Sequence, residues 1–278
     1  MSFYIKRFWK HFISKIYNWN SISVVFVIGT GRTGTEFFAK LCDQLFADKT
    51  ESVHEPFPDL LKISVEARKG KWSPSEISNE IRYSRLNRLR SLKKNDKCFY
   101  IESNNNISFL LPYLKRVFPN LKLLYFVRDP ESFLISEMNK RHGNKKFLIF
   151  GDDDHRERIS PKVLEDKFQD NWESWDRARK IIWYWKSCND YILSYINQYE
   201  SMIVKYEDFF KDINCVRKTL IFAGLDISGI SDDQLQSLLS RKLNSSKDMK
   251  YVSLNDFDDE FRNFFIQMTN SLKEKFNY

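Results

Sequence analysis

The chain has 278 residues, of which 42% are hydrophobic and 16% aromatic, so it can bury a sizeable core and a disordered chain is excluded. A formal net charge of +8 favours anionic partners such as nucleotides or sulfated and phosphorylated compounds. The basic residues are scattered along the chain rather than gathered in a long run, so we expect no nucleic-acid partner.

The first predicted element is an amphipathic helix over residues 1–20, which we separate from one larger domain over residues 21–278. Apolar residues such as Phe8 and Phe12 recur there at helical spacing, and basic residues occupy positions between them. We expect this helix to pack on the surface of the domain. Peripheral contact with an anionic membrane is the alternative, because basic amphipathic helices with aromatic residues bind such surfaces.

Cellular location is predicted from hydropathy and cysteine usage. No segment is long and apolar enough to span a bilayer, and no secretory signal is recognisable. The cysteines Cys42, Cys98, Cys188 and Cys215 show neither metal-ligand spacing nor the pattern of a disulfide framework. We therefore expect a cytoplasmic protein, with attachment to a membrane surface through residues 1–20 as the alternative.

Apolar runs and helical periodicity alternate along the remaining chain. Four apolar segments predict β-strands, at residues 24–28, 98–101, 121–127 and 201–209. Helical patterns follow each of them, the last three near residues 213–222, 232–239 and 257–276. This alternation predicts the α/β class: a single domain with a central parallel sheet flanked by helices. Gly29, Glu102 and Arg128 lie at strand ends, so we expect them to meet in one cleft.

The loop after the first strand has the glycine spacing of a phosphate-binding loop. It reads GTGRTGTE over residues 29–36. Thr35 stands where a nucleotide hydrolase has its lysine, and Glu36 stands where it has the hydroxyl that binds magnesium. Backbone N–H groups at the helix start still favour an anion, and Arg32 adds a planar guanidinium suited to oxyanions. A P-loop-like kinase is therefore the weaker interpretation, and we predict no metal site.

The segment FVRDPESFLIS places Arg128 at the end of a predicted strand and Ser136 within the next helix. At this spacing it resembles the 3′-phosphate motif of sulfotransferases, which use 3′-phosphoadenosine 5′-phosphosulfate (PAPS) as donor. The loop GTGRTGT resembles their 5′-phosphosulfate loop, in the version that carries arginine, and VKYEDF (204–209) resembles a third family element. The three motifs follow the family's order and together cover most of the chain. The resemblance implies a P-loop nucleotide-kinase-like sulfotransferase fold for residues 21–278.

The resemblance also assigns residues to the donor. The loop residues that would bind the 5′-phosphosulfate are Gly31, Arg32, Thr33, Gly34, Thr35 and Glu36. Arg128 and Ser136 would hold the 3′-phosphate, Phe37 would stack on adenine, and Tyr206 would approach the adenine. The alternative for Phe37 is core packing, for Arg128 a structural ion pair, and for Tyr206 a buried tyrosine with a paired hydroxyl.

An acceptor hydroxyl needs a general base within hydrogen-bonding distance. Glu55 is our first candidate, because an acidic residue before proline recurs at this point in carbohydrate-modifying relatives. His54 is second, since imidazole titrates near neutral pH, and Glu102 is third. Arg32 is expected to stabilise the departing diphosphate product. The structural alternative is that His54 and Glu55 only fix a turn before the prolines that follow them.

Two features depart from the cytosolic members of the family. Glu102 and Asn104 replace a basic residue and a histidine, and the C-terminal basic loop lacks its glycines. The chain therefore resembles carbohydrate- or tyrosine-modifying and bacterial members more closely. We expect an acceptor hydroxyl on a carbohydrate or glycolipid, bound by loops at residues 65–97 and 143–161. The alternatives are a catalytically silent nucleotide- or glycan-binding protein on this fold, a P-loop-like kinase, or a charge-driven binder of membranes or nucleic acid.

Overall fold

The structure is a computed structural model, and it describes residues 22–140, 149–151, 155–240 and 250–278. The predicted helix over residues 1–20 and most of the segment 141–154 lie outside the described residues. The N-terminal helix and its membrane contact therefore stay predictions. Within the described ranges, no helix combines the length and apolar character needed to cross a membrane.

Within the described part of the chain, five strands form one sheet in which every neighbouring pair is parallel. They are β1 (Ser23–Ile28), β2 (Thr50–His54), β3 (Phe99–Ser103), β4 (Leu121–Val127) and β5 (Glu200–Lys205), in the order β2-β3-β1-β4-β5. In the centre, Phe26 of β1 lies beside Glu102 of β3 and Leu123 of β4. The chain leaves β1 and β4 in opposite directions, so a ligand crevice is expected at their carboxyl ends.

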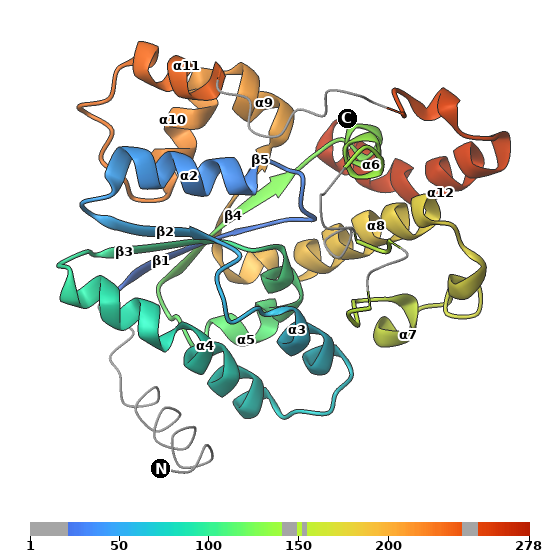
Figure 1. The fold of residues 1–278 in the computed structure, drawn as a ribbon, viewed down its shortest axis with the longest axis horizontal. Coiled ribbons are helices and arrows are strands. Elements are labelled where there is room, and N and C mark those ends of the chain that lie inside the picture. Colours follow the sequence, from blue (N-terminus) through green and yellow to red (C-terminus); the bar gives the residue numbers. More distant parts are fainter. Residues whose placement is uncertain (1–21, 141–148, 152–154, 241–249) are drawn as a thin grey trace.

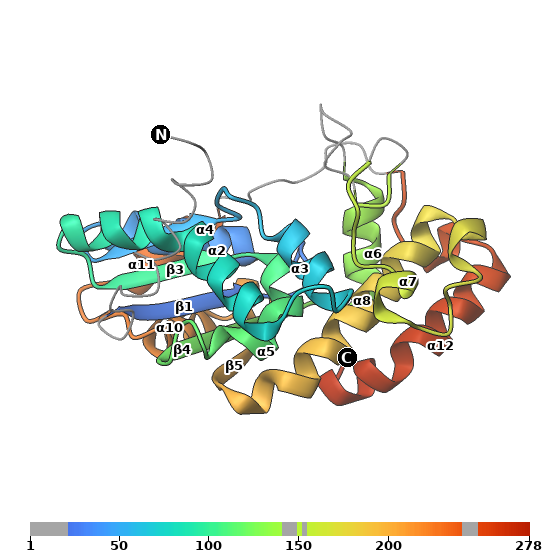
Figure 2. The same ribbon diagram turned by 90° about the horizontal axis from the view of Figure 1, so that it is seen from below.

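Helices cover both faces of this sheet, which confirms the predicted α/β architecture (Figure 1 and Figure 2). One face carries α2 (Thr35–Phe46), α9 (Tyr206–Lys211), α10 (Ile213–Phe222) and α11 (Asp232–Ser240). The other carries α3 (Leu61–Arg68), α4 (Pro74–Lys94), α5 (Leu111–Leu114), α6 (Pro130–Met138), α7 (Pro161–Leu164), α8 (Arg177–Tyr195) and α12 (Asp259–Phe276). Short 3-10 helices are η2 (Asn105–Leu110), η4 (Trp172–Ser174), η5 (Ile196–Gln198) and η6 (Leu254–Asp256).

The core is divided into two apolar clusters, one on each face of the sheet. Side chains alternate along β1, so Val24 and Phe26 join one cluster whereas Val25 and Val27 join the other. All four are at most 2% exposed. A strand buried on both faces needs an almost continuous apolar sequence, which is why β1 and β4 are readable from the sequence.

Three sequence predictions need correction. The strand β2 was missed, because TESVH has no apolar run and this edge strand pairs only with β3. The predicted strand at residues 201–209 ends at Lys205, and its last residues begin α9. Residues 65–97, predicted to be an acceptor-binding loop, are mostly the helices α3 and α4. Helix α4 starts at a capping box between Ser73 and Glu76 with Pro74 at its first position.

Candidate functional site

The loop between β1 and α2 is a tight turn that requires glycine. Gly34 has a φ of 87°, and a Cβ there would lie 2.8 Å from the ring of Phe210. A Cβ on Gly29 would lie 2.4 Å from the carbonyl oxygen of Phe126. No side chain within the described ranges caps the N-terminus of α2, so the first N–H groups of this helix remain available to an anion.

Thr33 supports the interpretation of this loop as an anion site. Its side chain is fully buried, and its Oγ1 atom has no hydrogen-bond partner among the described residues. An unpaired buried hydroxyl costs about 1–3 kcal/mol, so such groups are uncommon in folded proteins. An oxyanion in the loop would satisfy this hydroxyl together with the N–H groups of α2. The residues present therefore fit an oxyanion such as a phosphate or sulfate group.

Arg128 follows the last residue of β4 and contacts the loop between β1 and α2. Its Nη1 donates to the carbonyl oxygen of Arg32 at 2.8 Å, and its Nε donates to Ser132 Oγ at 2.8 Å. Burial lowers the pKa of Arg128, and this effect exceeds the opposing influence of Tyr206 and Glu207. Asp129 is not its ion-pair partner, because the Asp129 carboxylate caps α6 by accepting from the Ser132 N–H at 2.9 Å.

Each of the two serines of α6 forms a hydrogen bond with a different arginine. Ser136, predicted to act with Arg128, instead accepts a hydrogen bond from Arg32 Nε at 3.1 Å. Ser132, which the sequence analysis missed, is the serine that contacts Arg128. Its position four residues after Arg128, in the first turn of α6, is a signal that could have identified it. Both serines thus lie in the predicted site.

Aromatic rings form the side of the site next to β5. The guanidinium carbon of Arg128 lies 4.1 Å from the ring centroid of Tyr206. Tyr206 packs on Phe210 with a centroid separation of 4.8 Å, and Phe210 packs on Phe37 at 5.0 Å. Phe37 is only 8% exposed and belongs to the apolar core, whereas Tyr206 is partly exposed. Core packing thus accounts for Phe37, and stacking of adenine on it stays a prediction.

Thr35 is buried in the first turn of α2, and Glu36 beside it pairs with Lys40 at 2.7 Å. Burial alone would raise the pKa of Glu36, but the hydrogen bond from Lys40 and the nearby charges of His54 and Arg32 leave it lowered. The negative charge that Glu36 places beside the loop is therefore balanced by cations. This weakens the repulsion that a carboxylate at this position would exert on a bound anion.

The two preferred base candidates lie at the end of β2. His54 Nδ1 and Ser103 Oγ are 2.6 Å apart. Glu55 is exposed, its N–H donates to the Ser103 carbonyl oxygen at 2.8 Å, and its Oε1 accepts from Asn105 Nδ2 at 3.0 Å. Glu55 has a φ of 39°, in the left-handed region that non-glycine residues seldom adopt. Such strained residues concentrate at functional sites.

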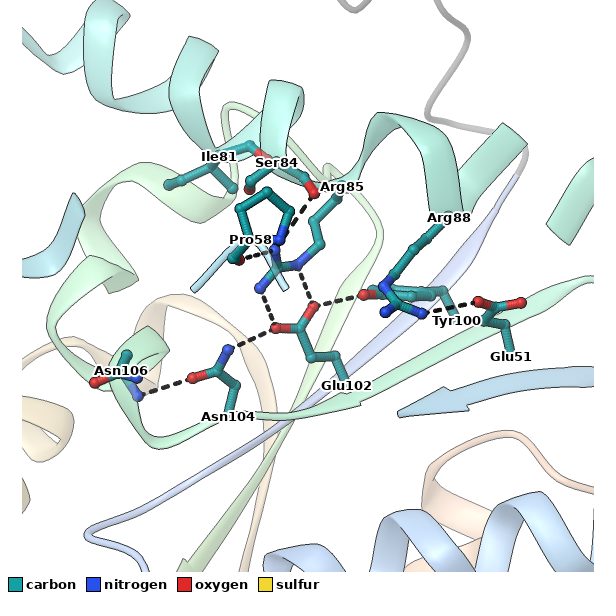
Figure 3. Close-up of polar contacts among 10 residues, drawn as sticks. All are labelled: Glu51, Pro58, Ile81, Ser84, Arg85, Arg88, Tyr100, Glu102, Asn104 and Asn106. Atoms are coloured by element: carbon teal, nitrogen blue, oxygen red, sulfur yellow. Dashed lines mark hydrogen bonds and ion pairs between the residues drawn. The ribbon is translucent and has the colours of Figure 1, made fainter. Parts of the chain in front are cut away.

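Glu102, the third base candidate, has a different role. Its side chain is fully buried and forms a two-pronged ion pair with Arg85, with both N–O distances 2.6 Å (Figure 3). The Tyr100 hydroxyl donates to it at 2.6 Å and Asn104 Nδ2 at 2.8 Å. Both oxygens are thus occupied and out of reach of an acceptor, so the structure argues against Glu102 as the base. Nothing in the sequence distinguishes Arg85 from the other basic residues of α4.

No group of three or more metal-ligating side chains occurs among the described residues. A cavity of about 630 Å³ lies beside α8 and α12, and Trp183, Tyr191 and Met268 are among its lining residues. Arg68, from the segment 65–97 predicted to bind the acceptor, lines it, and none of the predicted donor-site or base residues does.

Comparisons with known proteins identify similar folds and the family of the chain. Similar solved structures include sulfotransferase STF9 from Mycobacterium avium (13% identity over 98% of this chain and 80% of that chain, TM-score 0.56). They also include sulfotransferase STF1 from Mycobacterium tuberculosis H37Rv (14%, 94% and 80%, TM-score 0.52) and the sulfotransferase domain from the curacin biosynthetic pathway (12%, 93% and 99%, TM-score 0.51).

At these identities the structural likeness shows the fold alone. No curated protein sequence matches the chain. A sequence model of the family described as "Sulfotransferase domain" matches residues 23–265, which include the loop, Arg128 and Tyr206. Because this match covers most of the chain, the protein belongs to the sulfotransferase domain family.

Proposed function

We propose that the protein transfers the sulfuryl group of PAPS to an acceptor hydroxyl. The observation that carries this proposal is the 2.8 Å hydrogen bond from Arg128 Nη1 to the carbonyl oxygen of Arg32, which joins the two predicted anion sites. The loop at residues 29–36 would hold the 5′-phosphosulfate, with Thr33 Oγ1 as one of its donors. Arg128 and its neighbouring serines would hold the 3′-phosphate, and Tyr206 would lie against the adenosine.

Catalysis in this proposal depends mainly on positioning and on neutralising charge. The donor supplies an activated sulfuryl group, and its transfer spreads negative charge over the surrounding oxygens, as in phosphoryl transfer. Arg32 and the first N–H groups of α2 would stabilise that charge. Glu55 would accept the proton of the acceptor hydroxyl while the bond from sulfur to the acceptor oxygen forms and the bond from sulfur to the phosphate oxygen breaks. A base of this kind contributes about 10²–10⁴-fold.

The sequence of the loop disfavours a magnesium-dependent kinase. Thr35 replaces the phosphate-binding lysine, and Glu36 replaces the hydroxyl that holds magnesium in such enzymes. The likeness of Glu55-Pro56 to carbohydrate-modifying members supports an acceptor hydroxyl on a glycan or glycolipid. The cysteine pattern supports a cytoplasmic enzyme.

A thermal-shift titration with 3′-phosphoadenosine 5′-phosphate (PAP), the product nucleotide, tests the donor site. PAP at about 100 times its Kd should stabilise the wild type by roughly 2.7 kcal/mol, whereas ATP with magnesium should have little effect. Arg128→Ala should lose the PAP shift. Arg217→Ala should keep the PAP shift, because Arg217 of α10 pairs with Asp232 of α11 at 2.6 Å and is not a predicted site residue.

Two outcomes would contradict the proposal. If PAP fails to shift the wild type, or if ATP with magnesium alone shifts it, the loop does not bind this donor. If PAP binds but labelled PAPS is never consumed with any hydroxyl compound or with water, the protein is the catalytically silent nucleotide binder. Release of PAP from PAPS, followed by chromatography, distinguishes the enzyme from that binder.

A further inference from the structure

Asn105 lies between the donor loop and the candidate base. It follows β3 and begins the 3-10 helix η2. Its Nδ2 donates to Glu55 Oε1 at 3.0 Å, and a Cβ on Gly31 would lie 3.0 Å from the same nitrogen. One amide group therefore contacts both the residue proposed to accept the proton and the loop proposed to hold the donor. No motif in the sequence marks this residue.

The orientation of the Asn105 amide is set by Glu55. Its other polar atom, Oδ1, is buried and has no hydrogen-bond partner among the described residues. Reversing the amide would place Oδ1 against the Glu55 carboxylate, and two acceptor oxygens repel each other. Leaving a buried carbonyl oxygen unpaired lowers stability, and the hydrogen bond from Nδ2 to Glu55 offsets this cost.

The turn that carries Asn105 is fixed from one side by the buried ion pair. Asn104 Oδ1 accepts from the N–H of Asn106 at 3.0 Å, and Asn104 Nδ2 donates to Glu102 at 2.8 Å. Figure 3 shows this chain of contacts leading from the turn to Glu102. Asn105, between the two bridged residues, therefore has a backbone position that depends on Glu102.

The segment that carries Glu55 is fixed by the same ion pair. Arg85 binds both oxygens of Glu102 and also donates from Nη1 to the carbonyl oxygen of Pro58 at 2.9 Å (Figure 3). Pro58 is three residues after Glu55. A guanidinium has a rigid planar fork, so its donors fix the relative positions of the groups they bind. One buried pair thus sets the distance between Asn105 and Glu55.

We propose that Asn105 is a positioning residue, which holds the Glu55 carboxylate beside the donor loop and is itself held by the Arg85–Glu102 pair. The proposal rests on the proposed function, in which Glu55 receives the proton of the acceptor hydroxyl. Small misplacements of a reacting group cost large factors in rate, so a fixed carboxylate is an advantage that a freely rotating exposed glutamate lacks.

Asn105→Leu tests the proposal, because leucine has nearly the same shape and lacks both hydrogen-bonding atoms. The measured reaction is the hydrolysis of PAPS by water, followed as release of PAP, so no acceptor needs to be known. We expect kcat to fall about tenfold to a hundredfold while the KM for PAPS and the melting temperature change little. Asn263→Leu on the exposed face of α12 is the control and should leave kcat unchanged.

A double-mutant cycle with Glu55→Gln shows whether Asn105 acts through Glu55. Once Glu55 is neutralised, Asn105→Leu should cause no further loss of kcat. Equal losses with and without Glu55 would overturn the proposal, as would an unchanged kcat in Asn105→Leu. In either case PAP would still bind, so the proposed function would stand. A wild type that neither binds PAP nor hydrolyses PAPS would overturn the proposed function and this proposal together.

Discussion

Replacing Glu102 with glutamine tests whether its carboxylate is the structural partner of Arg85. Glutamine keeps the volume of the side chain, but it removes the charge and turns one acceptor oxygen into a donor that faces a guanidinium. The wild-type carboxylate accepts two bonds from Arg85, one from Tyr100 and one from Asn104, and both charged side chains are fully buried. The variant leaves the Arg85 charge buried without a counterion.

Breaking a buried ion pair in this way costs about 3–5 kcal/mol, a large part of the roughly 5–15 kcal/mol that stabilises a typical domain. The assay is equilibrium unfolding in urea, followed by tryptophan fluorescence. The midpoint should fall while the dependence of the unfolding free energy on urea concentration stays unchanged. Arg85→Met alone should cost a similar amount. The double variant should cost less than the sum, because no unpaired charge remains.

Glu51→Gln is the matched control for this experiment. Glu51 also pairs with an arginine of α4, but the shortest N–O distance to Arg88 is 3.4 Å and both side chains are partly exposed (Figure 3). A pair of this kind contributes about 0–1 kcal/mol. If Glu102→Gln lost no more stability than Glu51→Gln, or if the Arg85 and Glu102 losses simply added, the account of a buried structural pair would be refuted.

Two further predictions concern the start of α2. Gly34→Ala puts a Cβ 2.8 Å from the Phe210 ring at a φ of 87°, whereas Gly70→Ala meets nothing within 4 Å at a φ of 66°. In thermal melts, backbone strain should lower the free energy of unfolding by about 1–2 kcal/mol in both variants. Gly34→Ala alone should lose more stability and bind PAP more weakly. Equal losses in the two variants would contradict close packing at Gly34. Lys40→Ala should cost about 0.3–0.5 kcal/mol near neutral pH. The pKa of Glu36 is lowered in the folded protein. The stabilisation is therefore fully present when the pH is above the ordinary pKa of 4.5, and it is lost as the pH falls through the folded pKa. Urea melts at about pH 7 and about pH 3 check this, and an equal difference at both would contradict the pairing.

The central part of the fold could be predicted because burial on both faces leaves a clear sequence pattern. Residues 24–28 and 121–127 are apolar runs in the middle of the sheet, and both form strands. The edge strand β2 has no such pattern, because four of its five residues are only half-buried. Its identity comes from hydrogen bonds to β3, a partner that lies more than forty residues away in the sequence.

The site could be predicted where a residue's task is tied to a strand end. Arg32, Arg128 and Tyr206 were predicted separately from three motifs, and the parallel topology brings them into contact. Ser132 and Arg85 were missed for a physical reason. Hydropathy identifies a buried helix face only when that face is apolar, so a buried arginine among the basic residues of α4 has the same sequence pattern as a solvated one.

Arg85 also explains the departures from the cytosolic members at the end of β3. Taken alone, Glu102 and Asn104 suggest the loss of a basic residue and a histidine, and with them the loss of activity. In the structure they form one buried unit, in which Arg85 balances Glu102 and Asn104 connects the pair to the turn of Asn105. A carboxylate buried in this way cannot accept a proton from an acceptor, so the proposed chemistry needs its base from a neighbouring strand end. Glu55, exposed after β2 and bound by Asn105, is that residue in our proposal, and the same buried unit fixes its segment.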